Sequence, residues 1–444
     1  MEKDTMREEF AKQVQQLTEE LTEQIWEAIV DGKVDIERSD EWVRERGSKF
    51  LRKALGLALT NRSEQLGVDG ECRCGGRIEF RQRRDFQLHT VLAGRDVDVW
   101  IQYGQCESCR KGWFPLLTEM RVDREGFTQS LQELSTLAGV MEPYGPASEE
   151  LLGRFTGVKV SSEKIQSMVR QEGKKASTFL KQMPEEKSSE DTAQESQKPL
   201  YVGIDGGMVF VDGRWQEVKL GCLFKEEDRV VVGKNGDRER GKLISRQVVA
   251  IRGNPEELAK FLWPRACAVG ADKRKVVVLG DGAPWIWNLA ADLFPNRVEI
   301  LDWYHADEHV SKVARVLYGE KTPEAIAWRK EQLDRLKKDH VEEVIEGLTF
   351  LRGRYRSGTK REEIDNLKGY LKNNKHRMLY KTYKKSGYNI GSGAVESAVG
   401  HVVQQRMKRN GMRWHAPGAD LMLALRSIYR STGAWDQFWT SRAA

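Results

Sequence analysis

The first 68 residues carry the apolar pattern of helices. Between Val14 and Gly32, apolar residues recur at the period of an α-helix, and the glycine ends the run. A second helix is expected from about residue 40 to residue 59. We therefore predict an N-terminal helical region over 1–68, whose apolar faces serve packing or self-association.

Residues 69–116 change to a strand-like pattern. Glycine and arginine become frequent there, and the chain shows short runs of β-forming residues. These runs lie at 77–80, 86–91 and 97–103. The block is bounded by cysteines on both sides, so we predict a small β unit of its own.

Residues 117–182 return to a helical pattern. Two helical runs between residues 147 and 172 are separated by a break at Gly157. Ser161 and Ser162 stand where the N-cap of the second helix is expected. Two helices joined by a short turn are typical of a helix-turn-helix-like DNA-binding domain.

A segment almost devoid of apolar residues, 183–198, follows. It cannot offset its ordering entropy by burial, so we predict a linker and place the main domain boundary there. Residues 199–444 then combine apolar strand-like runs with helices, which predicts an α/β domain. Strands are expected at 200–204, 209–211, 216–224, 247–251, 276–279 and 298–301. Helices are expected at 255–263, at 284–293 and through the charged stretch 306–385.

Composition narrows the class of protein. The 444 residues are 39% hydrophobic and 32% charged, and no run of about 18 apolar residues is present, which excludes a membrane-spanning helix. The net charge of +6 is modest for a nucleic-acid binder, so a basic surface must be local. The charged N-terminus lacks the apolar segment of a signal peptide. We expect a soluble, cytoplasmic protein with no membrane partner.

Four of the six cysteines form two close pairs. They are Cys72, Cys74, Cys106 and Cys109. Paired cysteines flanking β-type sequence are the ligand pattern of a zinc ribbon, in which four thiolates close a structural Zn²⁺ site. The first pair is one residue tighter than the usual spacing, and the alternative is ordinary thiols in a small β unit. Cys222 and Cys267 lack a partner motif and are expected to be buried apolar residues.

Two carboxylates stand beside glycines after strand-like runs. Asp205 follows the run ending at Ile204, and Asp281 follows the run Val276–Leu279 and one glycine. Open α/β sheets bind ligands at strand ends, and glycines let a large ligand approach the backbone. Two carboxylates on neighbouring strands can share divalent cations, and such hard oxygen ligands suit Mg²⁺.

Two further motifs carry candidate chemistry. Ser392 is a possible cap for a helix whose first turn holds Glu396, a carboxylate that could complete the metal site. Asp302 and His305 follow another strand-like run, and we expect them to orient the metal ligands or the scissile phosphate. His309, one helical turn later, is expected to be structural.

A block of one charge sign surrounds Glu396. Between Asn366 and Arg413 there are eleven basic residues and one acid. The basic residues are Lys368, Lys372, Lys375, Arg377, Lys381, Lys384, Lys385, Arg406, Lys408, Arg409 and Arg413. Such a block predicts a polyanion path. The interleaved aromatic residues Tyr380, Tyr383, Tyr388 and Trp414 could stack on bases, although about half should be core.

The motifs in this order resemble one family of enzymes. They are Ile204–Gly207, Leu279–Ala283, Asp302–His305, Gly391–Ser397 and Gln405–Trp414. Together they resemble a DDE transposase of bacterial insertion sequences, and most closely the ISKra family, which is similar to the Mutator-like group. The Asp302-x-x-His305 pair matches the D(2)H motif of Mutator-like enzymes. The resemblance covers roughly residues 70–440.

The resemblance implies an RNase H-like catalytic domain over 199–444, with a helical insertion at about 306–390. It implies two Mg²⁺ ions, for which Mn²⁺ can substitute, held by Asp205, Asp281 and Glu396, with His305 assisting catalysis. The partners would be double-stranded DNA, both the terminal inverted repeats and the target, bound by a nucleoid-associated homodimer. DNA-binding residues would be Arg406, Lys408, Arg409, Arg413, Trp414, Lys381, Lys384 and Lys385.

Three other classes of function stay open. An RNase H-like nuclease or junction resolvase would use the same carboxylates but would not join strands. A domesticated transposase could act only as a DNA-binding regulator, although such a protein has no need for three carboxylates beside DNA. The least favoured alternative is a metal-free α/β binding module.

Overall fold

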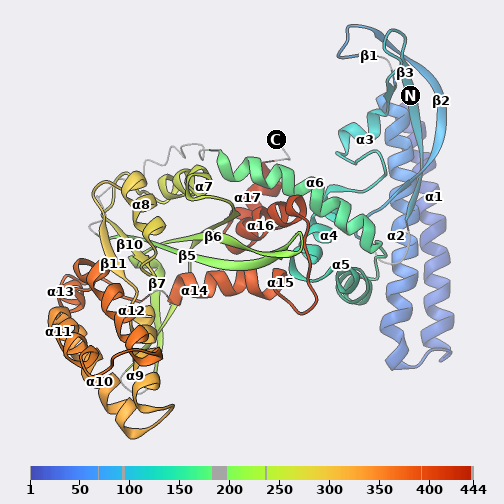
Figure 1. Ribbon diagram of the computed structural model, residues 1–444. Coiled ribbons are helices and arrows are strands. Elements are labelled where there is room, and N and C mark those ends of the chain that lie inside the picture. Colours follow the sequence, from blue (N-terminus) through green and yellow to red (C-terminus); the bar gives the residue numbers. More distant parts are fainter. Residues whose placement is uncertain are drawn as a thin grey trace. The chain divides into compact units, whose positions relative to one another are not determined.

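The computed structural model forms two compact units, Met1–Val169 and Arg170–Ala444 (Figure 1). It describes residues 2–68, 70–92, 96–182, 198–235, 238–391 and 393–441. The division lies inside helix α6 (Ser162–Lys181), and not at the predicted linker. Residues 183–197 of that linker, and the predicted cap Ser392, lie outside the described residues.

The N-terminal unit begins with two long helices. Helix α1 (Glu2–Ile25) continues through a further helical turn at Trp26–Val30, and α2 (Ile36–Leu66) begins after Asp35, whose side chain accepts from the amide of Arg38. The second helix is longer than predicted at both ends. It stops at Gly67, whose φ of 65° is a conformation that glycine adopts without strain.

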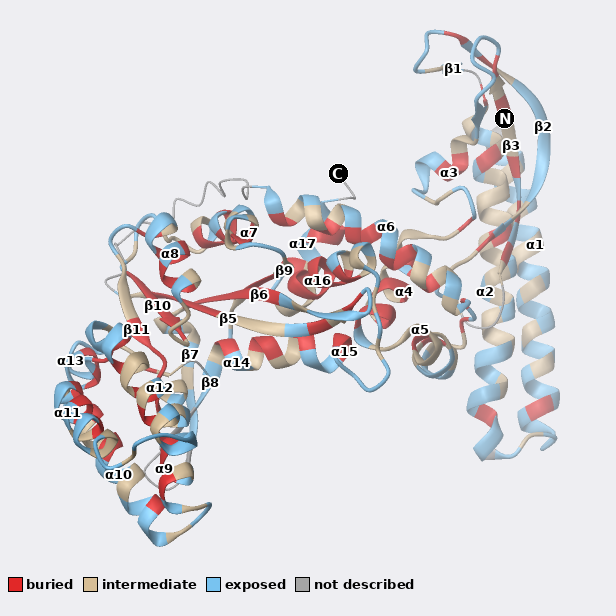
Figure 2. Ribbon diagram, in the orientation of Figure 1, coloured by how far each residue is buried: buried red, intermediate tan, exposed pale blue. Residues whose placement is uncertain are grey.

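A four-stranded antiparallel sheet follows, in the order β1-β2-β3-β4. Its strands are β1 (Gly70–Glu71), β2 (Arg77–Leu88), β3 (Val97–Cys106) and β4 (Gly112–Trp113). Two of the predicted runs thus belong to one long strand, β2. Only Ile78 and Leu88 of β2 are buried (Figure 2). A buried cluster that includes Val97, Val99 and Ile101 packs one end of the sheet.

Short helices complete this unit. They are α3 (Pro115–Glu119), α4 (Gln129–Met141), α5 (Tyr144–Pro146), the helical segment Ala147–Arg154 and the first part of α6. Gly157 breaks the chain at a φ of 73°, as predicted. Ser161 then caps α6, because its Oγ accepts from the amide of Lys164 at 3.2 Å.

The C-terminal unit is a mixed α/β structure built on a five-stranded sheet. The strands are β5 (Leu200–Val211), β6 (Arg214–Lys225), β9 (Gln247–Arg252), β10 (Val276–Gly280) and β11 (Val298–Leu301). Their order is β11-β10-β5-β6-β9. β10 is parallel to β5 and to β11, whereas β6 is antiparallel to both β5 and β9. A separate hairpin, β7 (Arg229–Asn235) and β8 (Arg238–Leu243), was not predicted.

Helices pack on both faces of this sheet (Figure 1). Helix α7 (Pro255–Ala268) covers one face. Its Leu262 lies so close to Gly221 of β6 that a Cβ on Gly221 would be 2.6 Å from the Leu262 side chain. Helix α14 (Gly393–Val399) covers the other face and continues through Gly400–Gln404 and α15 (Gln405–Met407). Helix α8 (Pro284–Leu293) connects β10 to β11.

The edge strand β9 is covered by helix α16 (Ala416–Arg430) and the residues after it. The amide of Ala250 donates to Ser427 Oγ at 2.9 Å, and the amide of Val248 donates to Ser431 Oγ at 2.8 Å. At the start of the strand, Thr432 exchanges two hydrogen bonds with the backbone of Arg246. Side chains of a helix therefore satisfy amides that an open edge would leave unpaired.

Five helices lie between β11 and α14. They are α9 (Trp303–Tyr318), α10 (Pro323–Leu336), α11 (Val341–Arg352), α12 (Thr359–Asn374) and α13 (Tyr380–Lys385). They form the predicted charged helical stretch, and α17 (Ala434–Thr440) closes the described chain. Among all the residues that the structure describes, no helix is both long enough and apolar enough to cross a membrane.

Candidate functional site

Asp205 lies in the middle of strand β5, and not at a strand end as predicted. Alternate residues of a strand share one face, so its side chain points to the same side as Gly203 and Gly207. Helix α14 packs on that side. A Cβ at Gly203 would lie 2.9 Å from Val395, and one at Gly207 would lie 3.4 Å from Val399. The two glycines thus let the helix that carries Glu396 lie directly over Asp205.

Asp281 comes level with Asp205 from the neighbouring strand. The parallel register of β10 and β5 pairs Leu279 with Gly203, and two residues further along are Asp281 and Asp205. A tight turn fixes the second carboxylate, whose Oδ1 accepts from the amide of Ala283 at 2.8 Å. Gly282 permits this turn with a φ of 104°, and a Cβ there would lie 2.9 Å from the ring of Tyr370.

Electrostatics show that the predicted residues influence one another. Burial raises the pKa of Asp205 to about 6, against a hydrogen bond from the Gly206 amide that lowers it. The negative charges of Asp281 and Glu396 raise this pKa further, whereas His305 lowers it. Asp281, Glu396 and His305 are therefore all close enough to Asp205 for their charges to act on it.

Asp302 and His305 lie at the start of helix α9. Asp302 is fully buried, and its Oδ1 caps the helix by accepting from the amide of Tyr304 at 2.5 Å. Its own amide donates to the carbonyl of Gly280 at 2.8 Å, which ties the helix start to the strand before Asp281. His305 is one turn into the helix, with Nδ1 3.8 Å from Glu308.

Sequence analysis missed a tyrosine at this site. The hydroxyl of Tyr370, on α12, donates to the carbonyl of Asp281 at 2.9 Å. Its ring stacks on His309 with a centroid distance of 3.9 Å, which explains the structural role expected for that histidine. Burial lowers the pKa of His309. Helix α12 thus holds the loop that carries Asp281.

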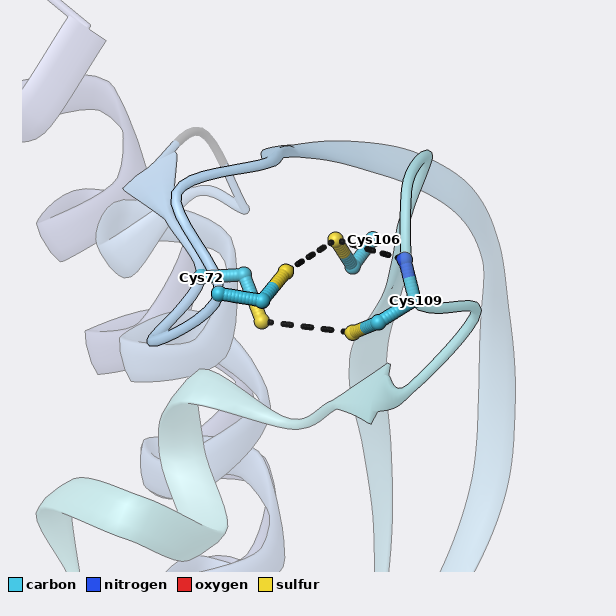
Figure 3. Close-up of side chains that lie close together, drawn as sticks. Cys72, Cys106 and Cys109 are labelled. Atoms are coloured by element: carbon cyan, nitrogen blue, oxygen red, sulfur yellow. Dashed lines mark hydrogen bonds between the residues drawn. The ribbon is translucent and has the colours of Figure 1, made fainter.

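The four predicted cysteines form a second candidate site. Their sulfur atoms all lie within 4.8 Å of one another, an arrangement that could hold a metal ion. Figure 3 shows the sulfur atoms of Cys72, Cys106 and Cys109 turned toward a common centre. The amide of Cys109 donates to Cys106 Sγ, and this hydrogen bond is the first cause that lowers the pKa of Cys106 to about 7.

Among the described residues, these cysteines are the one group of three or more metal-ligating side chains gathered so tightly. Asp205, Asp281 and Glu396 share a face of the sheet but do not converge to the same extent.

The predicted DNA-binding residues divide into buried and exposed groups. Arg406 is only 1% exposed, and its guanidinium lies over the ring of Trp414 at 5.2 Å. It therefore cannot meet a phosphate on the surface, which corrects the prediction. Trp414 donates through Nε1 to the carbonyl of Met407 at 3.1 Å and is partly buried. The exposed group consists of Lys381, Lys384, Lys385, Lys408, Arg409 and Arg413.

Other members of the basic block also serve the interior. Arg377 forms an ion pair with Glu299, and both side chains are largely buried. The aromatic residues Tyr380 and Tyr383 belong to the core. The surface that could follow a polyanion is thus smaller than the sequence indicated.

Residues 41–442 match the model of an uncharacterised protein family, UPF0236. The chain belongs to this family. A UPF0236 protein of Caldanaerobacter subterraneus subsp. tengcongensis is 23% identical over 439 residues, which are 96% of this chain and 78% of the relative. Its name joins eleven gene labels of that organism.

Other UPF0236 proteins of the same organism match more locally. Two of them are 30% identical over 161 residues, or 36% of this chain. The match spans only about a third of their length, at 32% and 30%.

Proposed function

We propose that this chain is a DDE transposase, which cleaves DNA at the ends of its own mobile element and joins the freed 3′ ends to target DNA. The observation that carries the proposal is that three carboxylates from distant segments lie on one face of the sheet, where the charges of two of them act on the third. Asp205 on the central strand, Asp281 after the parallel neighbour and Glu396 on the overlying helix act on one face of the sheet.

We extend the proposal to an RNase H-like core. The strand order supports it, because β5 is central, with the antiparallel β6 and β9 on one side and the parallel β10 and β11 on the other. The five helices between β11 and α14 would be the insertion that such enzymes carry before the last carboxylate.

The donor set suits hard divalent cations such as Mg²⁺ or Mn²⁺. Two bound ions would supply charge neutralisation and a deprotonated nucleophile for in-line displacement. The charges of Asp281 and Glu396 both act on Asp205, so Asp205 could ligate both ions, while Asp281 and Glu396 could each ligate one. Tyr370 would position Asp281 through the carbonyl of Asp281, and Asp302 would do so through the carbonyl of the preceding residue, Gly280. His305 would act at the edge of the site.

The comparisons contribute one supporting fact. The name of one relative joins eleven gene labels of a single organism. Repeated copies of one gene in a genome would lead to such a name. Multiplication of a gene within a genome is the expected result of transposition. A pair of DNA ends must be brought together in this reaction, so the proposed assembly is a homodimer on double-stranded DNA, at the nucleoid.

The test uses the full chain and labelled duplexes from the DNA that flanks its gene on both sides. With Mg²⁺ or Mn²⁺, we expect cleavage at one defined position in each flank, followed by joining to a target plasmid. Asp205→Asn, Asp281→Asn and Glu396→Gln should each abolish both steps and keep DNA binding. Glu256→Gln, an exposed carboxylate at the start of α7, is the matched control and should retain activity.

The alternatives predict different results. Cleavage without joining would identify a nuclease or resolvase. Specific binding of the flanking DNA without cleavage by the wild-type chain would identify a regulator. Wild-type activity in any one carboxylate variant would remove that residue from the site.

A further inference from the structure

The cysteine cluster of the N-terminal unit has the geometry of a closed tetrahedral metal site. Cys72 Sγ and Cys109 Sγ are 3.6 Å apart, and Cys74 Sγ and Cys106 Sγ are 3.5 Å apart. Four sulfur ligands at about 2.3 Å from a zinc ion are about 3.8 Å from one another. A disulfide would bring two sulfur atoms to about 2 Å. These two distances are thus close to the edges of a thiolate tetrahedron, and all four sulfur atoms lie within 4.8 Å of one another.

The two turns that carry the cysteines end in the same way. After Cys74, Gly75 has a φ of 81° and donates its amide to the carbonyl of Cys72. After Cys109, Arg110 has a φ of 60° and donates its amide to the carbonyl of Cys106. A left-handed residue directly after the second cysteine therefore closes both turns. This common ending explains how the tighter first pair can still aim both sulfur atoms inward.

The backbone after the first cysteine pair packs tightly against the second pair. Gly76 lies so close that a Cβ there would be 2.8 Å from Cys106 Sγ and 2.5 Å from Ser108 Oγ. Cys106 is fully buried, while Cys74 is exposed. The cluster is therefore a packed but solvent-reachable site at the end of the sheet.

At this end of the sheet, the buried side chains of Val68 and Ile78 lie against Gly104. The buried cluster around Val99 packs the opposite end of β2 and β3. From Glu79 to Gln87 no residue of β2 is buried. Small units that cannot bury enough apolar surface are commonly stabilised by a structural metal. Tetrahedral four-sulfur sites hold zinc or iron, and a tie between two turns requires no redox change.

We propose that Cys72, Cys74, Cys106 and Cys109 bind one structural Zn²⁺ ion that ties the β1–β2 turn to the β3–β4 turn. The inference is independent of the proposed transposase activity, because it concerns the stability of the N-terminal unit alone.

The first measurement is metal content. The full chain purified without added metal should contain about one zinc ion per chain, and little iron. The double variant Cys106→Ser/Cys109→Ser should retain less than a tenth of that zinc after dialysis against a chelator. The control Cys267→Ser, at a half-buried cysteine outside the cluster, should keep it all.

A second pair of variants tests the geometry without touching a ligand. Gly76→Ala should lower zinc affinity at least tenfold, because the new methyl group meets Cys106 Sγ. Gly70→Ala, whose Cβ would meet nothing within 4 Å, should not.

A third measurement does not depend on any variant folding. The wild-type chain, stripped of metal and given Co²⁺, should develop the absorption of a tetrahedral four-thiolate complex. Stoichiometric iron, zinc that survives in the double cysteine variant, or two disulfides found by mass spectrometry of the untreated wild-type chain would each overturn the proposal.

Discussion

Asp205 is a carboxyl group whose surroundings favour its protonated form. Its pKa is raised from 3.8 to about 6, first by burial. Well below pH 3.8 the group is protonated in both the folded and the unfolded chain, so its burial costs no stability there. Between about pH 4 and 6 the unfolded chain ionises this carboxyl more readily than the folded chain does, so stability falls across this range and stays lower above it.

Replacing Asp205 by Asn should remove this loss. The free energy of unfolding of Asp205→Asn should equal that of the wild type at about pH 3 and exceed it at pH 8 by up to about 3 kcal/mol, since one pKa unit corresponds to about 1.4 kcal/mol. Urea denaturation across this pH range, without divalent cations, measures the difference. Parallel curves for the two chains would contradict the assignment of the pKa.

If Asp205 ligates Mg²⁺, added Mg²⁺ should make the wild type more stable than Asp205→Asn at pH 8. The reason is that a ligand that binds only the folded state stabilises that state. The wild type should gain stability with added Mg²⁺ and Asp205→Asn should gain little. This comparison separates the electrostatic result from the proposed metal site.

The basic residues divide by burial into two kinds with different expected effects. Lys408, Arg409 and Arg413 are exposed. Replacing all three by Gln should weaken binding to every DNA sequence and reduce the slope of log affinity against log salt by about 2–3. Fluorescence anisotropy at several salt concentrations measures both quantities.

Arg406→Gln provides the contrast, because Arg406 is buried over Trp414. It should lower thermal stability and leave the salt slope unchanged. If the triple variant keeps the wild-type slope, the exposed basic residues lie off the DNA path.

At the scale of elements, the contact of α14 with β5 decides whether Glu396 reaches the other carboxylates. Gly203→Ala should destabilise the chain by about 1–3 kcal/mol, because the new Cβ would lie 2.9 Å from Val395. Any cleavage activity should fall with it. Gly207→Ala is the graded control, since its Cβ would meet Val399 at an ordinary 3.4 Å. Thermal unfolding of the two variants should differ clearly, and equal stability would show that α14 can shift without cost.

Local patterns predicted most strands and helices of the C-terminal unit. The helix at Pro284–Leu293 and the strand at Val298–Leu301 begin and end where their apolar runs do. Strand β5 was wrongly predicted to break after Ile204, because Gly206 and Gly207 resemble a turn. The spacing Gly203-x-Asp205-x-Gly207 contained the correct signal, since alternate small residues on a strand indicate that a helix packs closely on that face.

Other features depend on contacts that no local pattern contains. Tyr370 stands in a charged helix, and its link to Asp281 joins residues 89 positions apart. Arg406 belongs to a basic run, yet it is buried because Trp414 returns to lie against it. Strands β7 and β8 combine one short apolar run, Val230–Val232, with charged residues and glycines, so they show no alternating pattern. Long-range packing decides the first two features, and pairing between the two strands decides the third.

At the scale of the whole molecule, the chain divides into two units that should respond differently to metal removal. If zinc ties the turns at Cys72 and Cys106, a strong chelator should accelerate hydrogen exchange in the sheet of strands β1–β4. The sheet that contains β5 and β10 should keep its protection. Hydrogen-exchange mass spectrometry of the full chain reads both sheets in one experiment, and equal acceleration in both would contradict independent units.

The covering of β9 by α16 also has a consequence for synthesis. Val248 and Ala250 find their partners at Ser431 and Ser427, which the ribosome adds 183 and 177 residues later. Until then, a nascent chain carries a strand with free amides, which is a template for pairing with a neighbouring chain. A message truncated before codon 416 would therefore yield an aggregating product, because β9 becomes protected only after α16 has been synthesised.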